Sequence, residues 1–342
     1  MQVAYAGSRG VRLYRGVAIN QARIASLNHP IVNAVTGQTI TDNSFDNASL
    51  RAPMQGVDPF FFTVNSTTAH STYDSFQGSI NRQSSHGLQF SASYTFSKSI
   101  DNASSPGGGA GSDGSLDLGG GLDTASTWGN QLDPRANRGL SDFDRTHRLV
   151  VSSVWEIPEP SFARDSAVAR LMLSHWQVSA IVIAMSGLPV DIFDPSGGSL
   201  YGAFGDRPNW APGATRRSAM NNVPAGYSFN PLAFAQAIVK AAAPIPSASD
   251  PTALSSDLET DIGNLGRNVL RGPAQSDFDV SLGKRFPLSE STGIEIRAEF
   301  FNVLNHANRD NPVSDISAAD FGRVVSYSSS PRIVQFMLKL TF

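Results

Sequence analysis

RIVQFMLKLTF, residues Arg332–Phe342, closes the chain and decides its fold. The stretch alternates, so every second side chain would share one face of an extended strand. One face would carry the apolar residues Val334, Phe336, Leu338, Leu340 and Phe342. The other face would carry Ile333, Gln335, Met337, Lys339 and Thr341. Because a strand of about 9–11 residues, tilted by about 45°, crosses the hydrocarbon core of a bilayer, the stretch predicts the terminal strand of an outer-membrane β-barrel.

The composition agrees with a wall that is apolar on one side and polar on the other. Hydrophobic residues make up 40% of the 342 residues and charged residues only 16%, which leaves a large uncharged polar share. The formal net charge of −3 shows no basic excess, so we expect no nucleic-acid partner. The absence of cysteine excludes disulfides and thiolate metal sites. No run of residues approaches the roughly 18 apolar residues of a membrane helix.

Other stretches of the chain also show strand patterns. The clearest is Leu88–Ile100, in which Leu88, Phe90, Ala92, Tyr94 and Phe96 alternate with uncharged polar residues. Trp155 and Trp176 lie near strand ends, as residues of an aromatic girdle do. The remaining predicted strands are Met1–Ala6, Thr72–Arg82, His147–Pro158, Trp176–Ser186, Phe278–Phe286 and Ile294–Asn305.

The connections between these strands alternate in length, from long to short and back, along the whole chain. Outer-membrane barrels have short periplasmic turns and long extracellular loops in that alternation. The chain therefore predicts an all-β fold, the carboxyl-terminal portion of a transmembrane antiparallel β-barrel with about eight strands. Two connections have helical propensity, in the segments Ala167–Leu173 and Pro231–Ala243.

A group of charged residues alternates with the apolar residues of the last strands. Glu295, Arg297 and Glu299 would share the face opposite to Ile294 and Ile296. Such a face would line a water-filled lumen, where we expect a cross-strand ladder of charges. The predicted lumenal charges are Arg285, Glu295, Arg297, Glu299 and Lys339.

Several stretches resemble one known family, the TonB-dependent outer-membrane receptors. The resemblance is to the carboxyl-terminal part of their barrel, in the group whose members carry a carboxypeptidase-regulatory-like domain. The matching stretches follow the family's order over nearly the whole chain. They are SYTFSKSIDNAS (93–104), RGLSDFDRTHRLVVSSVWEIP (138–158), WQVSAIVIAMSGLPV (176–190), GNLGRNVLRGPAQSDFDVSLGKRFPL (263–288), IRAEFFNVLNHAN (296–308) and the terminal strand.

This resemblance implies a protein of the bacterial outer membrane, with a barrel of about 22 strands and a plug inside it. Extracellular loops would capture a small ligand, such as a siderophore or an oligosaccharide, for uptake through the polar lumen. The partners implied are the outer-membrane lipid and the TonB energy-coupling complex, which acts through an amino-terminal part. The barrel-assembly machinery would read the terminal strand, at Phe336, Leu338, Leu340 and Phe342.

The domain organisation expected for residues 1–342 is a single segment, the carboxyl-terminal part of such a barrel. The sequence begins with MQVAYAGSRG, which has no basic region leading into an apolar one, so this stretch does not resemble a signal peptide. No stretch is a candidate for the plug or for the coupling box. We interpret the sequence as a fragment of the receptor.

No catalytic or cofactor site is expected. The histidines have no HExxH spacing and the chain has no GxSxG elbow. The glycine-rich run Pro106–Asp123 lacks the repeated register of calcium-binding repeats and predicts a loop. Aromatic residues in the loops are candidates for ligand contact, namely Phe60, Phe61, Phe62, Trp128, Tyr201, Phe204 and Trp210.

Two other classes of protein fit parts of the pattern. About eight strands can close into a narrow barrel that acts as an adhesin or a structural surface protein. A secreted carbohydrate-binding β-sandwich would show the same alternation, but its apolar faces would have to pack on each other. Water solubility would distinguish the sandwich from either barrel.

We predict that the protein partitions into the outer-membrane fraction and that an epitope inserted within Pro106–Asp123 is accessible from outside the cell. The measurement is membrane fractionation followed by antibody labelling of intact cells. Recovery as a soluble periplasmic monomer without detergent would contradict the membrane fold.

Overall fold

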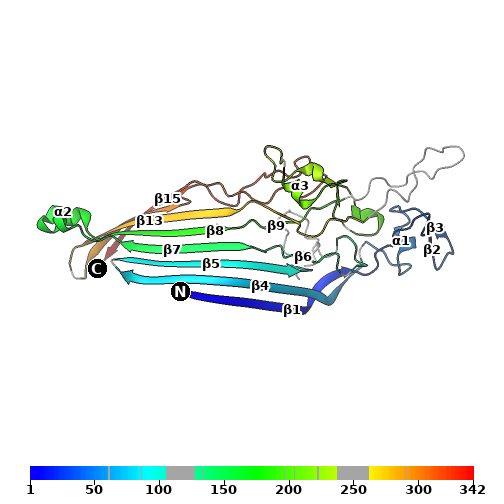
Figure 1. Ribbon diagram of the computed structural model, residues 1–342, viewed down its shortest axis with the longest axis horizontal. Coiled ribbons are helices and arrows are strands. Elements are labelled where there is room, and N and C mark those ends of the chain that lie inside the picture. Colours follow the sequence, from blue (N-terminus) through cyan, green and yellow to red (C-terminus); the bar gives the residue numbers. More distant parts are fainter. Residues whose placement is uncertain are drawn as a thin grey trace.

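The computed structural model describes residues 1–342 except 61, 86, 105–127, 134, 196, 204, 222, 237–261 and 290. One long antiparallel sheet forms most of the molecule, and the long loops gather at one end of it (Figure 1). We call the gathered loops the cap. The opposite end of the sheet is the turn end, where the carboxyl terminus lies (Figure 1).

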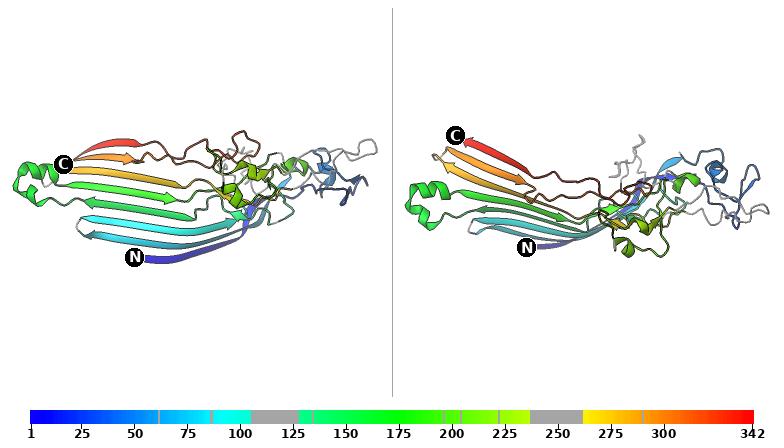
Figure 2. Two further views of the ribbon diagram at one scale, coloured as in Figure 1. Left: turned by 45° about the horizontal axis from the view of Figure 1, so that its top comes forward. Right: turned by 90° about the horizontal axis from the view of Figure 1, so that it is seen from above.

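The sheet has the strand order β1-β4-β5-β7-β8-β13-β14-β15, and the short β6 pairs with β5. Each long strand therefore pairs with the long strand that precedes it in the sequence, as in the wall of an up-and-down barrel. Figure 2 shows these strands as one curved layer. Their bounds are β1 Gln2–Ala18, β4 Thr63–Ser85, β5 Leu88–Asp101, β6 Gly139–Leu140, β7 His147–Glu156, β8 Trp176–Met185, β13 Gln275–Pro287, β14 Gly293–Phe301 and β15 Ile333–Thr341.

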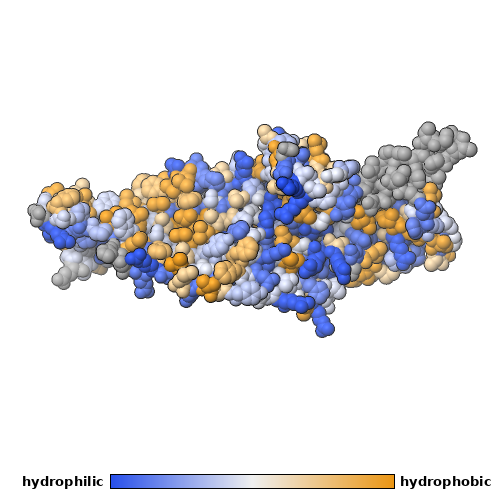
Figure 3. Space-filling view, in the orientation of Figure 1, coloured by the Kyte–Doolittle hydropathy of each residue, from blue (hydrophilic) through white to orange (hydrophobic). Residues whose placement is uncertain are grey.

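The register of the strands places apolar side chains on one face of the whole sheet. Leu338 pairs with Ile296, which pairs with Lys284, and the face continues across β8 and β7 to Phe96 and Phe76. We call it the apolar face, and the other side the polar face. The apolar face is bare, since Phe336 is 76% exposed and Leu338 73%. Figure 3 shows hydrophobic residues gathered over the strands. A face of this kind needs lipid as its surroundings.

Aromatic residues lie on the apolar face near both ends of the strands. Trp155 and Trp176 lie near the turn end, and Tyr94 and Phe96 lie further toward the cap. Leu88, beside Trp155, is eight residues before Phe96 in the same strand. That separation is about 27 Å at the usual strand rise, close to the height of an apolar band in outer-membrane barrels.

The connections alternate as predicted. At the cap end they span residues 19–62, 102–146, 186–274 and 302–332. At the turn end two connections are tight, from Ser85 to Leu88 and from Pro287 to Gly293. The third, residues 157–175, is longer and carries the 3-10 helix η2, Ser161–Asp165, and α2, Ala167–Leu173. The helix predicted at Ala167–Leu173 is confirmed.

The predicted first strand, Met1–Ala6, is too short. Strand β1 continues through Gly7, Ser8 and Gly10 to Ala18. The pairing with β4 shifts register after Gly10, where Arg12 has φ 58°. A Cβ at Gly10 would lie 2.5 Å from Oγ of Ser71. These glycine positions therefore mark a bulge and a close approach within a strand, not its end.

Two other boundaries differ from the sequence predictions. Strand β4 begins at Thr63, inside the stretch expected to be irregular, because its first residues pair with the extended β1. The expected helix Pro231–Ala243 is replaced by the 3-10 turn η4, Pro231–Ala233, and the strand β11, Phe234–Ala235. Strand β11 pairs with β10, Asn209–Trp210, so a contact distant in sequence overrides helix propensity. Residues 237–243 lie outside the described residues.

The sheet is open. Strands β1 and β15 lie at its two edges, and no described residues pair one edge with the other. The described structure therefore does not form the narrow, closed eight-stranded barrel. The β-sandwich prediction is wrong, because the apolar face belongs to a single sheet and is not covered by a second one.

Most buried apolar residues of the described chain lie in the cap. The exceptions are Ala18 in β1, Ala69 in β4 and Ala163 in η2. One cluster contains Ile192, Phe229, Phe234, Leu270 and Phe321, and a second contains Leu200 and Tyr201. The cap connections also contain short elements of secondary structure. They are β2 Ile31–Val32, β3 Thr39–Ile40, α1 Ala48–Arg51, β9 Pro189–Val190, η3 Gly197–Leu200, α3 Arg216–Met220 and β12 Leu270–Arg271. Among the described helices, none has the length and apolar character to cross a membrane.

We predict that Leu338→Arg, on the apolar face of β15, lowers the free energy of unfolding by about 2–4 kcal/mol in a bilayer. Gln335→Arg is the matched control, because Gln335 lies on the polar face opposite Glu299. The measurement is denaturant unfolding in phospholipid vesicles, followed by the electrophoretic shift of the folded protein. Equal destabilisation by both variants would contradict the assignment of faces.

Candidate functional site at the cap and the polar face

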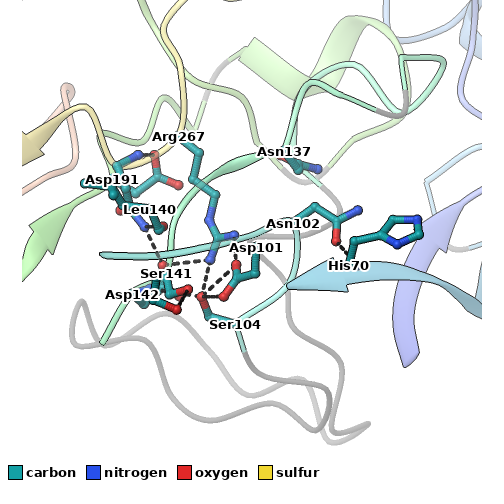
Figure 4. Close-up of polar contacts among 12 residues, drawn as sticks. His70, Asp101, Asn102, Ser104, Asn137, Leu140, Ser141, Asp142, Asp191 and Arg267 are labelled. Carbon is teal, nitrogen blue, oxygen red and sulfur yellow. Dashed lines mark hydrogen bonds and ion pairs between the residues drawn. The ribbon is translucent and has the colours of Figure 1, made fainter. Parts of the chain in front are cut away.

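The cap is attached to the strand ends by a buried arginine, Arg267, which is 4% exposed. Its Nη1 lies 2.6 Å from Oδ1 of Asp101, the last residue of β5. Its Nη2 lies 2.8 Å from Oδ1 of Asp142 and donates to Oγ of Ser104 at 2.7 Å. Figure 4 shows Arg267 reaching from one loop into a group of polar side chains from another. The contacts join residues more than a hundred positions apart in the sequence.

Two more arginines extend this attachment. Arg271 forms an ion pair with the fully buried Asp144, whose other oxygen accepts from the backbone N–H of Ser99 in β5 at 2.5 Å. Arg207 donates to both oxygens of Asp191, with Nη2 at 2.7 Å from Oδ2. Bidentate and charge-assisted hydrogen bonds of this kind are strong and directional. We call Arg207, Arg267, Arg271 and their carboxylate partners the cap cluster.

The electrostatics of the cap follow from burial. Burial alone would lower the pKa of Arg267, but Asp142, Asp101 and Asp191 outweigh it and raise that pKa. Burial raises the pKa of Asp206, although Arg207 and nearby backbone N–H groups partly oppose the shift. Burial, reinforced by Asp206, also raises the pKa of Tyr201 well above its ordinary value. Arg267 therefore stays charged and paired, and Tyr201 stays neutral.

A further arginine joins the first cap loop to the third. Arg51 is 1% exposed and donates to the carbonyl oxygens of Arg23, at 2.5 Å, and of Leu200. Burial lowers the pKa of Arg51 to about 10, so it remains protonated at neutral pH. The loops of the cap are thus fixed to one another as well as to the strands.

The charged residues predicted for the lumen come together on the polar face. Nη2 of Arg297 lies 2.5 Å from Oε1 of Glu295, and its Nη1 lies 3.6 Å from Oε1 of Glu299. Arg285 and Lys339 are the cross-strand neighbours of Glu295 on either side. A cavity of about 480 Å³ near the turn end is lined by Arg285, Glu295 and Arg297. The register of β13, β14 and β15 therefore brings this set together.

A second cavity, of about 460 Å³, opens on the polar face nearer the cap. Its apolar lining comes from Ile183, Met185, Phe301 and Ile333, and its polar lining includes Asp277, Asp279 and Asn308. Residues 328–331 of the last loop also line it. No pattern described above for the sequence predicts this cavity. The available signal was Asp277 and Asp279, which alternate with apolar residues of β13.

The aromatic loop residues do not form one site. Trp128 is 4% exposed and stacks on Phe193, with ring centres 4.3 Å apart, and Tyr201 is fully buried. These two predictions of ligand contact are therefore wrong for this conformation, because both side chains fill the interior of the cap. Trp210 is half-buried against Phe234.

Phe60 and Phe62 have more accessible positions. Phe60 is half-buried, with its ring 4.8 Å from that of Phe45, and Phe62 is 36% exposed. Both remain candidates for contact with a ligand. Phe61 and Phe204, as well as the glycine-rich run Pro106–Asp123, lie outside the described residues.

The residues predicted to form a barrel-assembly signal are exposed. Phe336, Leu338 and Leu340 project from the apolar face of β15, at an unpaired edge of the sheet, and Phe342 is 94% exposed. Elsewhere in the described residues, no three His, Asp or Glu side chains gather closely enough to hold a metal ion.

A bare apolar face, a polar face with paired charges and a loop cap at one end define a membrane β-barrel wall. The family described as "Outer membrane beta barrel domain" matches residues 1–335, so the chain belongs to that family and to the bacterial outer membrane. Among solved structures, the chain is similar to the outer membrane transporter YddB from Escherichia coli, with 11% identity and a TM-score of 0.40. The match covers 99% of this chain and 29% of the length of that transporter. No curated protein matches the chain.

We predict that Arg267→Met lowers the free energy of cap opening by about 3–5 kcal/mol, because the buried carboxylate of Asp101 loses its charged partner. Arg170→Met is the control, since Arg170 is 57% exposed in its pair with Glu159 and such pairs contribute about 1 kcal/mol or less. Proteinase K cleavage of the cap in isolated outer membranes measures the opening. A cap equally resistant in both variants would show that the cluster is not what holds it.

Proposed function

We propose that this chain is the carboxyl-terminal part of the barrel of a TonB-dependent receptor, and that it takes part in ligand uptake. The observation that carries the proposal is the meeting of the family-like stretches in the cap cluster. Asp101 comes from SYTFSKSIDNAS, Asp142 and Asp144 from RGLSDFDRTHR, and Arg267 and Arg271 from GNLGRNVLRGP. Stretches that resemble one family in sequence thus also act together as one structural unit.

The attached cap suits a receptor. Capture of a ligand by loops is efficient when the loops are held in position by a rigid scaffold. Buried ion pairs and hydrogen bonds fix the loops of the cap to the cap end of β5. Phe60 and Phe62 remain accessible. Phe60 and Phe62 would form the aromatic surface that contacts a small ligand, such as a siderophore or an oligosaccharide.

The polar face suits a path for a hydrophilic ligand. It has a cavity near the cap and another near the turn end, and the charges of Arg285, Glu295 and Arg297 line the second. In barrels of this class the lumenal side chains tune selectivity. We assign transport and not catalysis to these residues, because Glu295 in the cavity near the turn end is paired with Arg297.

The open edges suit a larger barrel. In lipid the backbone groups of β1 and β15 must be paired, so we propose that further strands join these edges. A plug within that barrel and coupling to the TonB complex would complete the receptor. The exposed terminal strand would be the part that the barrel-assembly machinery recognises.

The test is accumulation of radiolabelled ferric siderophores and oligosaccharides in cells that encode the chain. We predict that deletion of its gene and deletion of the energy-coupling protein abolish accumulation of the same compound. Deleting both should have no additional effect, because the two proteins act in one step.

A variant links that uptake to the polar face. Arg297→Gln should change uptake while leaving the amount of protein in the outer membrane unchanged, and Gln335→Arg serves as a membrane-level control. Uptake that persists without the energy-coupling protein would contradict the proposal.

A further inference from the structure

The connection between β7 and β8 differs from the other connections at the turn end. The others pass from strand to strand within a few residues, whereas residues 157–175 form the helices η2 and α2 (Figure 1). Outer-membrane barrels usually have short turns on this side, the periplasmic side. The extra length therefore requires a physical reason.

The two helices expose apolar side chains. Phe162 is 67% exposed, Val168 71%, Leu171 55% and Met172 59%. The last three are spaced i, i+3 and i+4, so they share one side of α2. No residue of α2 is buried. Contiguous apolar surface of this kind marks a contact that the isolated molecule lacks.

Helix α2 has only 7 residues. Isolated helices shorter than about 12–15 residues are marginal in water and depend on packing of their apolar side. Ser166 caps the amino end of α2 by accepting from the N–H of Ala169, but one cap does not replace the missing packing. The helix requires an apolar environment.

Two side chains of the apolar face fix the end of this connection. Nε1 of Trp176 donates to the carbonyl oxygen of Met172 at 2.9 Å, and Nζ of Lys284 donates to that of Ser174 at 2.6 Å. Trp176 and Lys284 are cross-strand partners, and Nζ of Lys284 lies 4.9 Å from the ring centres of both Trp176 and Phe286. Tryptophan and lysine beside an apolar band are typical of the membrane interface.

We propose that η2 and α2 form an interfacial anchor in the periplasmic leaflet of the outer membrane. Phe162, Val168, Leu171 and Met172 insert among the phospholipid acyl chains, where they continue the apolar face. The segment carries Arg164 and Arg170 against Glu159 and Asp165, so its charges balance. Apolar burial therefore drives the insertion, and anionic lipid is not required. The anchor fixes the height of β7 and β8 in the membrane, independently of any transport activity.

The absence of cysteine from the chain makes the test direct. Leu171→Cys and, separately, Val168→Cys are labelled with the fluorophore NBD, and the full-length protein is reconstituted into phosphatidylcholine vesicles. Val35→Cys is the control, because Val35 is 75% exposed in the cap. Spin-labelled phospholipids with the quencher near the top or near the end of the acyl chain report the depth.

We expect blue-shifted emission at both α2 positions, with severalfold stronger quenching than at Val35→Cys. The shallow quencher should be the more effective one, since interfacial helices lie about 5–10 Å into the headgroup boundary. Replacing part of the phosphatidylcholine by phosphatidylglycerol should leave the quenching unchanged.

Three results would overturn the proposal. Emission characteristic of water would show that α2 stays outside the membrane. Blue-shifted emission without quenching by spin-labelled lipid would show that protein covers α2. If insertion of α2 required phosphatidylglycerol, electrostatic attraction and not apolar burial would be its cause. A failure to find ligand uptake would leave the anchor unaffected, because its readout is the contact with lipid.

Discussion

The requirement that backbone N–H and C=O groups be paired within hydrocarbon governs this structure. It explains why the long strands form one uninterrupted antiparallel order from β1 to β15. It also explains why an insertion in β1 is absorbed as a bulge near Gly10, with pairing to β4 resuming beyond it. Since the pairings from Phe76 in β4 to Leu338 in β15 keep apolar side chains on the same side, the apolar face is continuous between these residues. The same requirement means that the backbone groups of the two edge strands, β1 and β15, need hydrogen-bond partners in a bilayer.

Few apolar side chains of the described sheet are buried, so most buried apolar contacts of the described chain lie in the cap. Phe229, Phe234 and Phe321 pack edge to face there, while Arg267 and Arg271 connect the loops to the strand ends. The two kinds of contact have different roles. Apolar packing gives the cap its stability, and the buried ion pairs fix its position relative to the wall. Loops held in this way present a fixed surface, and a fixed surface loses less conformational entropy when it binds a partner.

The two ends of the wall are specialised in different ways. At the cap end, polar and charged side chains connect loops to strands, as with Asp101. At the turn end, Trp176 and Lys284 connect an exposed apolar helix to the wall. Between them the polar face carries the paired charges of Glu295, Arg297 and Glu299. The apolar face of the wall suits contact with lipid, and its polar face suits contact with water. The loops are held in place by their contacts with the strand ends.

The sequence alone determined the alternation of β5 and β15, the alternation of connection lengths and the helix Ala167–Leu173, because each depends on neighbours within a few residues. It also determined which charges share the polar face of β14, since strand geometry places every second side chain together. Only the tertiary structure decided that β1 continues through its glycines, that Trp128 and Tyr201 are buried, and that Arg267 pairs with Asp101. Those outcomes depend on partners far away in the chain, and local pattern carries no information about which distant segments will meet.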